Sequence, residues 1–144
     1  MASWKEQALI EAPVEEVWSV LEDPSRFGEW AGNVEVTGAP TKIEKGSTLD
    51  ITGPTPLGNR NTTTFRVEEL DELREIKLRC QESGYYSHWL LTEAQGDTFT
   101  HCEYGIEPVL GLKGRAYSAI HTKGYLRRAA QGSLDGLRRL LNKK

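Results

Sequence analysis

The pattern of apolar and polar positions near the N-terminus predicts a strand followed by an amphipathic helix. Polar and apolar residues alternate from Trp4 to Glu11 with the period of two that is typical of a strand. Beyond Pro13, apolar residues recur at the i, i+3, i+4 and i+7 spacing of a one-sided helix, at Val14, Val17, Trp18 and Leu21. Pro13 favours a helix start, because its missing N–H would have no partner in the first turn. We expect Trp18 to be a core residue that seals this helix against a sheet.

A second, short helix is predicted directly after the first. Asp23 can cap this helix, and Pro24 suits its first position. The segment carries Phe27 and Trp30 and ends near Gly32. The chain therefore opens with one strand and two helices before the next strand begins.

Residues 33–108 have the patterns of a β meander. The predicted strands are Val34–Gly38, Thr48–Thr52, Thr62–Leu70, Glu75–Gln81, Tyr85–Thr92 and Thr98–Ile106. Turn-forming residues separate these strands, and the connections are too short for parallel crossovers, so we expect antiparallel hairpins. Only Gly53–Asn61 is long, and its glycine and proline content predicts an exposed loop.

A long helix is predicted at the C-terminus, from Arg115 to Leu141. Its apolar face comprises Ala116, Ala119, Ile120, Leu126, Ala130, Leu134, Leu137 and Leu141. Lys123 and Arg127 fall within this same face, one turn apart. Because the helices and the strands occupy separate parts of the chain, the predicted fold class is α+β, and we expect one domain over residues 1–144.

Composition and charge narrow the class of protein further. The chain has 18 Lys+Arg against 21 Asp+Glu, a net charge of −3, which argues against nucleic-acid binding through a basic field. No apolar run approaches the roughly 18 residues of a membrane span, and no signal-like segment opens the chain. We therefore expect a cytoplasmic protein that does not insert into membranes. Cys80 and Cys102 are expected as reduced thiols, and no spacing of ligands suggests a metal or another cofactor.

Two short segments of the sequence resemble those of a known superfamily. They are Ile10–Trp18 (IEAPVEEVW) and Asp23–Trp30 (DPSRFGEW), and the predicted order of elements fits around them. The chain resembles the START/SRPBCC (Bet v 1-like helix-grip) superfamily, and within it the polyketide cyclase/dehydrase-like and coenzyme-Q-binding-like proteins. The resemblance covers essentially the whole chain. It implies a helix-grip fold, in which a curved antiparallel sheet in β-α-α-β6-α order wraps a long C-terminal helix and leaves an internal cavity.

The resemblance implies that the protein binds and sequesters a small, largely apolar ligand, such as a lipid, a quinone or a polyketide-like molecule, between the sheet and the C-terminal helix. A polyketide cyclase or dehydratase is one alternative, with Arg66, Arg79 and Tyr104 as candidates for enolisation. No catalytic motif is present, so the sequence leaves open whether the protein is an enzyme. A protein-interaction factor is the other alternative, with the basic residues Arg138-Arg139 and Lys143-Lys144 as its local feature.

Strand and helix phase select candidate residues for the cavity. Tyrosine and tryptophan combine a large apolar surface with one hydrogen-bonding group, which suits a cavity wall. The wall candidates are Trp30, Phe65, Cys80, Trp89, Tyr104, Tyr117 and Ile120. The candidates for a gate at the mouth are Phe27, Trp30, Gly53, Pro54 and Leu57.

Lys123 and Arg127 allow two interpretations, because a charge within an apolar face is costly unless it is paired or hydrated. In the first, both stems lie on apolar surface while the charged groups reach solvent. In the second, both side chains point into the cavity and meet an anionic or carbonyl group of the ligand, with Glu103 as their partner in the empty protein. The second interpretation places Lys123 and Arg127 among the candidate ligand-binding residues.

Overall fold

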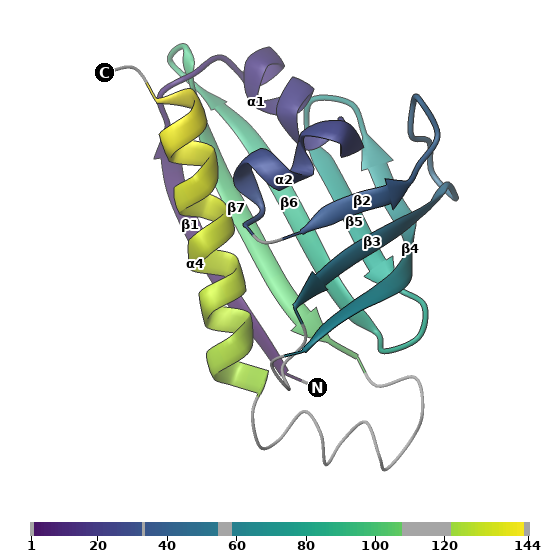
Figure 1. Cartoon of the computed structure of the whole chain (residues 1–144). Helices are drawn as coiled ribbons and strands as arrows, with labels where there is room; N and C mark the ends of the chain where they lie inside the picture. Colours follow the sequence, from purple (N-terminus) through teal and green to yellow (C-terminus); the bar gives the residue numbers. More distant parts are fainter. Residues whose placement is uncertain (1, 33, 55–58, 108–121, 143–144) are drawn as a thin grey trace.

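The computed structural model describes residues 2–32, 34–54, 59–107 and 122–142 (Figure 1). Its elements are β1 Ala2–Ile10, α1 Val14–Leu21, the 3₁₀ turn η1 Pro24–Arg26, α2 Phe27–Trp30, β2 Glu35–Gly38, β3 Thr48–Pro54, β4 Arg60–Asp71, β5 Glu75–Cys80, β6 Tyr85–Ala94, β7 Asp97–Ile106 and α4 Thr122–Leu141. These elements confirm the predicted strands and helices, with small shifts at their ends. The predicted start of the last helix, at Arg115, lies outside the described residues.

All the strands form one antiparallel sheet, in the order β1-β7-β6-β5-β4-β3-β2. Strands β2 to β7 follow one another as a meander, and β1 closes the far edge by pairing with β7 from Ala2↔Ile106 to Ile10↔Thr98. The sheet curves around the helical layer, and α4 runs along β1 and β7 (Figure 1). This is the α+β class that the sequence pattern predicts and the helix-grip architecture that the family resemblance implies.

Local chemistry accounts for the two helical segments after β1. The apolar side of α1 is fully buried, and Trp18 is only 3% exposed, so its predicted place in the core is confirmed. Asp23 caps η1 as expected, with its side chain accepting a hydrogen bond of 3.0 Å from the Ser25 backbone N–H. The short helix α2 follows directly and buries Phe27 and Trp30. Both rings face the inner side of the sheet, where the cavity lies.

Helix α4 packs over the edge of the sheet formed by β1 and β7. Its buried residues are Leu126, Ala130, Ser133, Leu134, Gly136, Leu137 and Leu141. One flank of α4 contacts β1, since the Gln131 amide donates a hydrogen bond of 2.9 Å to Glu6 and the Arg127 guanidinium lies 5.5 Å from the Trp4 ring centre. The other flank is turned toward α2 and the middle of the sheet.

The predicted exposed loop Gly53–Asn61 is longer than the connection that forms. Gly53 and Pro54 still belong to β3 and pair with Asn61 and Arg60 of β4. Sheet pairing therefore overrides the local glycine and proline content, and a proline at a strand end removes no essential ladder hydrogen bond. Residues 55–58 lie outside the described residues.

Candidate functional site

A cavity of about 620 Å³ lies between the inner face of the sheet, α2 and α4. This volume falls within the range of roughly 300–1,000 Å³ that is usual for small-molecule sites. The described residues that line it are Phe27, Trp30, Ala31, Gly32, Val34, Ile51, Gly53, Pro54, Asn61, Thr63, Phe65, Leu78, Cys80, Ser83, Tyr85, Ser87, Tyr104, Ile106, Tyr125, Arg128, Ala129, Gly132 and Ser133. Apolar and aromatic side chains dominate the lining, with a few hydroxyl and amide groups among them.

Strand alternation builds the sheet wall of the cavity. Every second residue of a strand faces the same side, so Phe65, Tyr85 and Tyr104 come together from three different strands. Their rings contact edge-on, with the centre of Tyr85 6.1 Å from that of Phe65 and 6.1 Å from that of Tyr104. The wall is therefore a continuous aromatic surface, stabilised by edge-to-face ring contacts.

Three phenol groups contribute to the hydrogen-bonding capacity of the cavity, together with the hydroxyls of Thr63, Ser83, Ser87 and Ser133 and the amide of Asn61. Burial raises the pKa of Tyr85 and of Tyr104 well above the ordinary value for tyrosine. The Tyr104 hydroxyl is hydrogen-bonded to Ser133 of α4, and Tyr85 to Tyr125. Tyr125 in turn donates to the Pro54 carbonyl oxygen at 2.8 Å and so ties α4 to the end of β3. At neutral pH these phenols stay protonated and act as neutral hydrogen-bonding groups.

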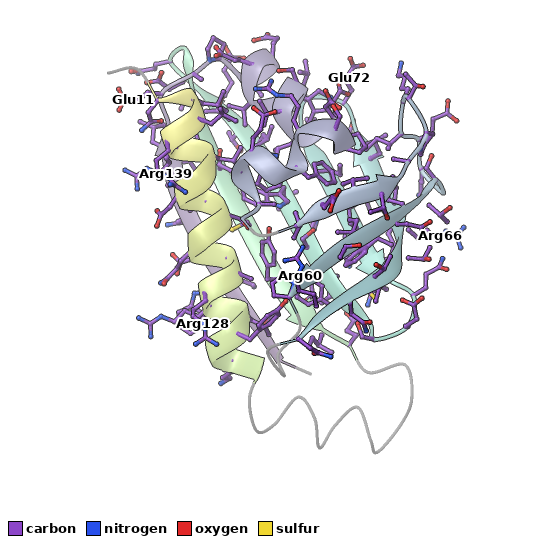
Figure 2. The ribbon with its side chains drawn as sticks, viewed as in Figure 1. Glu11, Arg60, Arg66, Glu72, Arg128 and Arg139 are labelled. Atoms are coloured by element: carbon purple, nitrogen blue, oxygen red, sulfur yellow. The ribbon has the colours of Figure 1, made fainter. Side chains whose placement is uncertain are left out.

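Arg128 is the one charged side chain among the described lining residues, and it is exposed on α4 (Figure 2). That part of the lining contains no carboxylate and no imidazole. The Cys80 thiol lies on the wall and donates a hydrogen bond of 3.3 Å to the Glu82 carboxylate. The described interior is therefore apolar with neutral polar groups, and its single cation is at the surface.

Most of the predicted cavity residues that can be checked do line the cavity. Four wall candidates, Trp30, Phe65, Cys80 and Tyr104, are on its surface, and so are the gate candidates Phe27, Gly53 and Pro54. Trp89 is not part of the lining: it lies behind the wall, 2% exposed, with its ring centre 5.4 Å from that of Trp30. Trp89 faces the inner side of the sheet, as its position in the strand predicts, but the rings of Trp30 and Tyr104 lie between it and the cavity. Tyr117, Ile120 and Leu57 lie outside the described residues.

The structure places Lys123 and Arg127 differently from the second interpretation, in which both point into the cavity. Both side chains are exposed and neither lines the cavity, so the first interpretation, with charged groups in solvent, holds. The reason is the position of α4, because Arg127 lies on the flank that contacts β1 rather than on the flank that faces the cavity. Glu103, their expected partner, lies on the outer face of the sheet beside Tyr86.

The two arginines considered for enolisation also lie away from the cavity. Arg66 is exposed and projects outward from β4 (Figure 2). Arg79 faces the outer side of the sheet, where it forms ion pairs with Glu68 at 2.5 Å and Glu107 at 3.2 Å. Of the three candidates for enolisation, only Tyr104 lines the cavity.

Several lining residues were not selected from the sequence. Tyr125, Ala129 and Gly132 form the helical side, at the i, i+4 and i+7 spacing of one helix flank. This spacing was visible, but two of the three residues are too small to stand out as an apolar pattern. Ser87 and Thr63 were likewise passed over, although each shares the inward phase of its strand.

A second hollow of about 720 Å³ lies among the described residues, between the end of α1, η1 and the segment that follows β2, and its lining is polar and apolar in similar measure. No group of three or more His, Cys, Asp or Glu residues in the described part of the chain could hold a metal ion. His88 is paired with Glu75 at 2.5 Å outside the cavity, and His121 is not among the described residues. Both cysteines are free and buried, as expected for reduced thiols. Among the same residues, no helix has the length and apolar character needed to cross a membrane.

The fold and the cavity define a helix-grip protein of SRPBCC type. The chain belongs to the family described as "Polyketide cyclase / dehydrase and lipid transport", which it matches over residues 1–142. A comparison with curated proteins gives no significant match.

Solved structures share the fold at low sequence identity. Protein CV1439 from Chromobacterium violaceum has a TM-score of 0.71 at 16% identity, and the match covers 99% of this chain and 98% of that one. For the AHSA1-like protein from Aeromonas hydrophila the TM-score is 0.69 at 18% identity, with 96% and 90% covered. The di-domain ARO/CYC StfQ from the steffimycin biosynthetic pathway gives 0.71 at 14%, covering 96% of this chain and 50% of that one. These similarities establish the fold and leave the ligand open.

Proposed function

We propose that the protein binds a small, largely apolar molecule, such as a lipid, a quinone or a polyketide-like compound, in the cavity between the sheet and α4. The observation that carries this proposal is the cavity itself, about 620 Å³ with an aromatic wall and no buried charge among its described residues. The family to which the chain belongs supports the same class of ligand.

The physical basis of binding is the hydrophobic effect. A volume of about 620 Å³ equals about 20 water molecules at roughly 30 Å³ each. Water beside the rings of Phe65 and Trp30 finds few hydrogen-bonding partners, so an apolar ligand gains free energy by replacing it. The gain is roughly 25 cal/mol for each Å² of apolar surface removed from water.

The polar groups of the lining favour one type of ligand and one orientation. The buried phenols of Tyr85 and Tyr104 suit a carbonyl or hydroxyl oxygen of the ligand. A carboxylate at that depth would lose its hydration without meeting a cation, which is costly. An acidic group of the ligand would instead lie at the surface, near Arg128.

A cyclase or dehydratase is a second candidate, favoured by the phenols in the cavity and by the structural similarity to StfQ. Such a reaction needs a group that removes a proton from carbon. The raised pKa values of Tyr85 and Tyr104 make them poor bases at neutral pH, and the described lining offers no carboxylate or imidazole for this task. The lining therefore supports binding more strongly than turnover. Incubation with a poly-β-ketone distinguishes the two, because only an enzyme would give one cyclised product faster than the mixture that the free compound forms spontaneously.

Native mass spectrometry of the purified protein tests the proposal. We expect a retained small molecule that is released by organic extraction, and its mass identifies the ligand class. The variant Ser87→Leu places a larger side chain in the cavity and should lose this molecule. Thr92→Leu is the matched control, since Thr92 lies on the same strand but is exposed on its other face.

Two results would contradict the proposal. One is equal retention by both variants, which would place the bound molecule outside the cavity. The other is a protein that arrives empty and binds no apolar probe afterwards. That second result would favour the protein-interaction alternative, in which the exposed Arg138 and Arg139 would contribute to a partner surface.

A further inference from the structure

Helix α4 contains three glycines, Gly124, Gly132 and Gly136, within 20 residues. Glycine is the least favourable helix residue after proline, so each of these positions calls for a structural reason. Gly136 has a clear reason, since a Cβ there would lie 2.1 Å from the Trp30 carbonyl oxygen. Gly124 is exposed near the start of the helix, where the nearest atom to a Cβ is the flexible Arg128 Nη1 at 3.3 Å.

Gly132 has no such reason in the packing of the protein. It lies one helical turn before Gly136, yet a Cβ at Gly132 would meet no atom within 4 Å. Gly132 also lines the cavity. Gly132 is exposed, one helical turn from the exposed Arg128, so a side chain there would project into the open space at the surface end of the cavity.

Other residues with small side chains lie beside Gly132 on the same side of the cavity. Ala129 lines it from the same flank of α4, and Ala31 and Gly32 line it from the segment after α2. None of these residues has a side chain longer than a methyl group. The sheet side, in contrast, presents the rings of Phe65, Tyr85 and Tyr104. Tyr125 and Ser133 of α4 reach Tyr85 and Tyr104 of this wall, so the residue at position 132 sets the width of the cavity between these contacts and the surface.

We propose that Gly132 determines the shape of the ligand, by leaving room for a ring-bearing molecule that lies against the aromatic wall and reaches the backbone of α4. This inference rests on the proposed function. A single alkyl chain is narrower and can pass along the aromatic wall without using the space at Gly132. The ligand class that best fits this cavity is therefore a fused-ring or multi-ring neutral molecule rather than a linear acyl chain.

Two uncharged probes of different width test the inference. N-phenyl-1-naphthylamine is broad and aromatic, and 1-decanol is a single chain. Binding of both is followed by intrinsic tryptophan fluorescence, because Trp30 lines the cavity. In Gly132→Leu we expect the Kd for N-phenyl-1-naphthylamine to rise by about tenfold or more, as a branched side chain fills the space that the rings need. The Kd for 1-decanol should change by less than about threefold.

Gly124→Leu is the matched control, because Gly124 lies on the same helix outside the cavity lining. It should change neither Kd. Gly132→Ala is a second, milder variant, and alanine stabilises a helix relative to glycine. In this variant the Kd for N-phenyl-1-naphthylamine should rise, while the Kd for 1-decanol should stay constant. Both variants at Gly132 should keep the wild-type circular dichroism spectrum.

The outcomes separate the inference from the proposed function. If the wild-type protein binds both probes and Gly132→Leu leaves the affinity for N-phenyl-1-naphthylamine unchanged, the inference is wrong and the proposed function stands. Equal losses for both probes also overturn it, because position 132 would then close the cavity to any ligand. A wild-type protein that binds neither probe contradicts the proposed function, and the inference with it.

Discussion

Replacing Gly136 by alanine tests the contact between α2 and α4 that borders the cavity. A Cβ at this position would lie 2.1 Å from the carbonyl oxygen of Trp30, 2.9 Å from its carbonyl carbon and 3.0 Å from its Cα. These are backbone atoms, so no side-chain rotation relieves the clash. The C-terminal turn of α2 would have to move by roughly 1 Å, and closely packed interiors resist such displacements.

Two opposing effects decide the size of the change in stability. Alanine gains about 1 kcal/mol over glycine in a helix interior. Overpacking a well-packed contact costs about 1–3 kcal/mol, and more where backbone has to shift. We therefore expect Gly136→Ala to lower the free energy of unfolding by about 1–2 kcal/mol, which corresponds to a fall in Tm of roughly 3–7 °C for a chain of this length. In Gly132→Ala the clash is missing, so its Tm should rise by about 3 °C.

Thermal and urea unfolding followed by circular dichroism measure both variants under the same conditions. The opposite signs are the important result, because intrinsic helix propensity alone would stabilise both proteins equally. If Gly136→Ala were as stable as Gly132→Ala, α2 would not rest on the backbone of α4, and the described border of the cavity would be wrong. A loss of stability in both variants would show that residue 132 is also packed.

Three further predictions concern residues outside the cavity. Lys123→Ala and Arg127→Ala should leave the Kd for N-phenyl-1-naphthylamine unchanged within about twofold, because both side chains lie in solvent. Arg79→Met should lower the free energy of unfolding by about 1 kcal/mol through its lost ion pairs, without changing that Kd. Above pH 9 the protein should lose stability, because burial raises the pKa of the Cys102 thiol from 9.0 to about 12. The thiol then ionises at a lower pH in the unfolded chain than in the folded protein, which favours unfolding. This contribution is fully present below about pH 9 and is lost as the pH rises toward 12.

Fluorescence titration and urea unfolding check these predictions, and each has a contrary result. Weaker binding in Lys123→Ala or Arg127→Ala would mean that α4 turns its other flank to the ligand. A changed Kd in Arg79→Met would connect the outer face of the sheet to the site. Cys102→Ala is the control for the alkaline effect and should show a shallower decline than the wild type. Equal stability at pH 9 and pH 11 in the wild type would contradict the burial of Cys102.

The fold could be predicted in detail because its elements are encoded locally. The alternation of Ile76, Leu78 and Cys80 with charged residues fixes which face of β5 is buried, and the structure buries all three. The helical spacing from Val14 to Leu21 predicts the ends of α1 correctly. Each of these patterns depends on neighbours within a few residues, so no knowledge of the tertiary structure is needed to interpret it.

The candidate site could be predicted only in part, because its geometry depends on contacts between distant segments. Helical periodicity identifies the buried face of α4, but the flank that faces the cavity is decided by packing against β1, more than a hundred residues away. Helical periodicity therefore allowed an interpretation with Arg127 in the cavity and gave no indication of Gly132. Trp89 shows the same limit, since strand phase predicts its direction but not that Trp30 lies in front of it.

The loop predicted from glycine and proline content is partly wrong, because sheet pairing determines the structure at Gly53 and Pro54. Gly53 and Pro54 suggested a loop, yet both extend β3 and line the cavity. The hydrogen bond from Tyr125 to the Pro54 carbonyl joins residues far apart in the sequence, and no local pattern indicates it. The sequence therefore predicts which faces are apolar better than it predicts how they surround a ligand.

The most direct test of the central claim is to locate a bound apolar molecule by NMR. Intermolecular NOEs are measured between N-phenyl-1-naphthylamine and isotope-labelled protein. We predict NOEs to Phe65, Tyr85 and Tyr104, whose rings line the cavity from the sheet. NOEs confined to Leu9 and Leu90, which are exposed apolar residues of the sheet outside the cavity lining, would contradict the account, as would the absence of saturable binding.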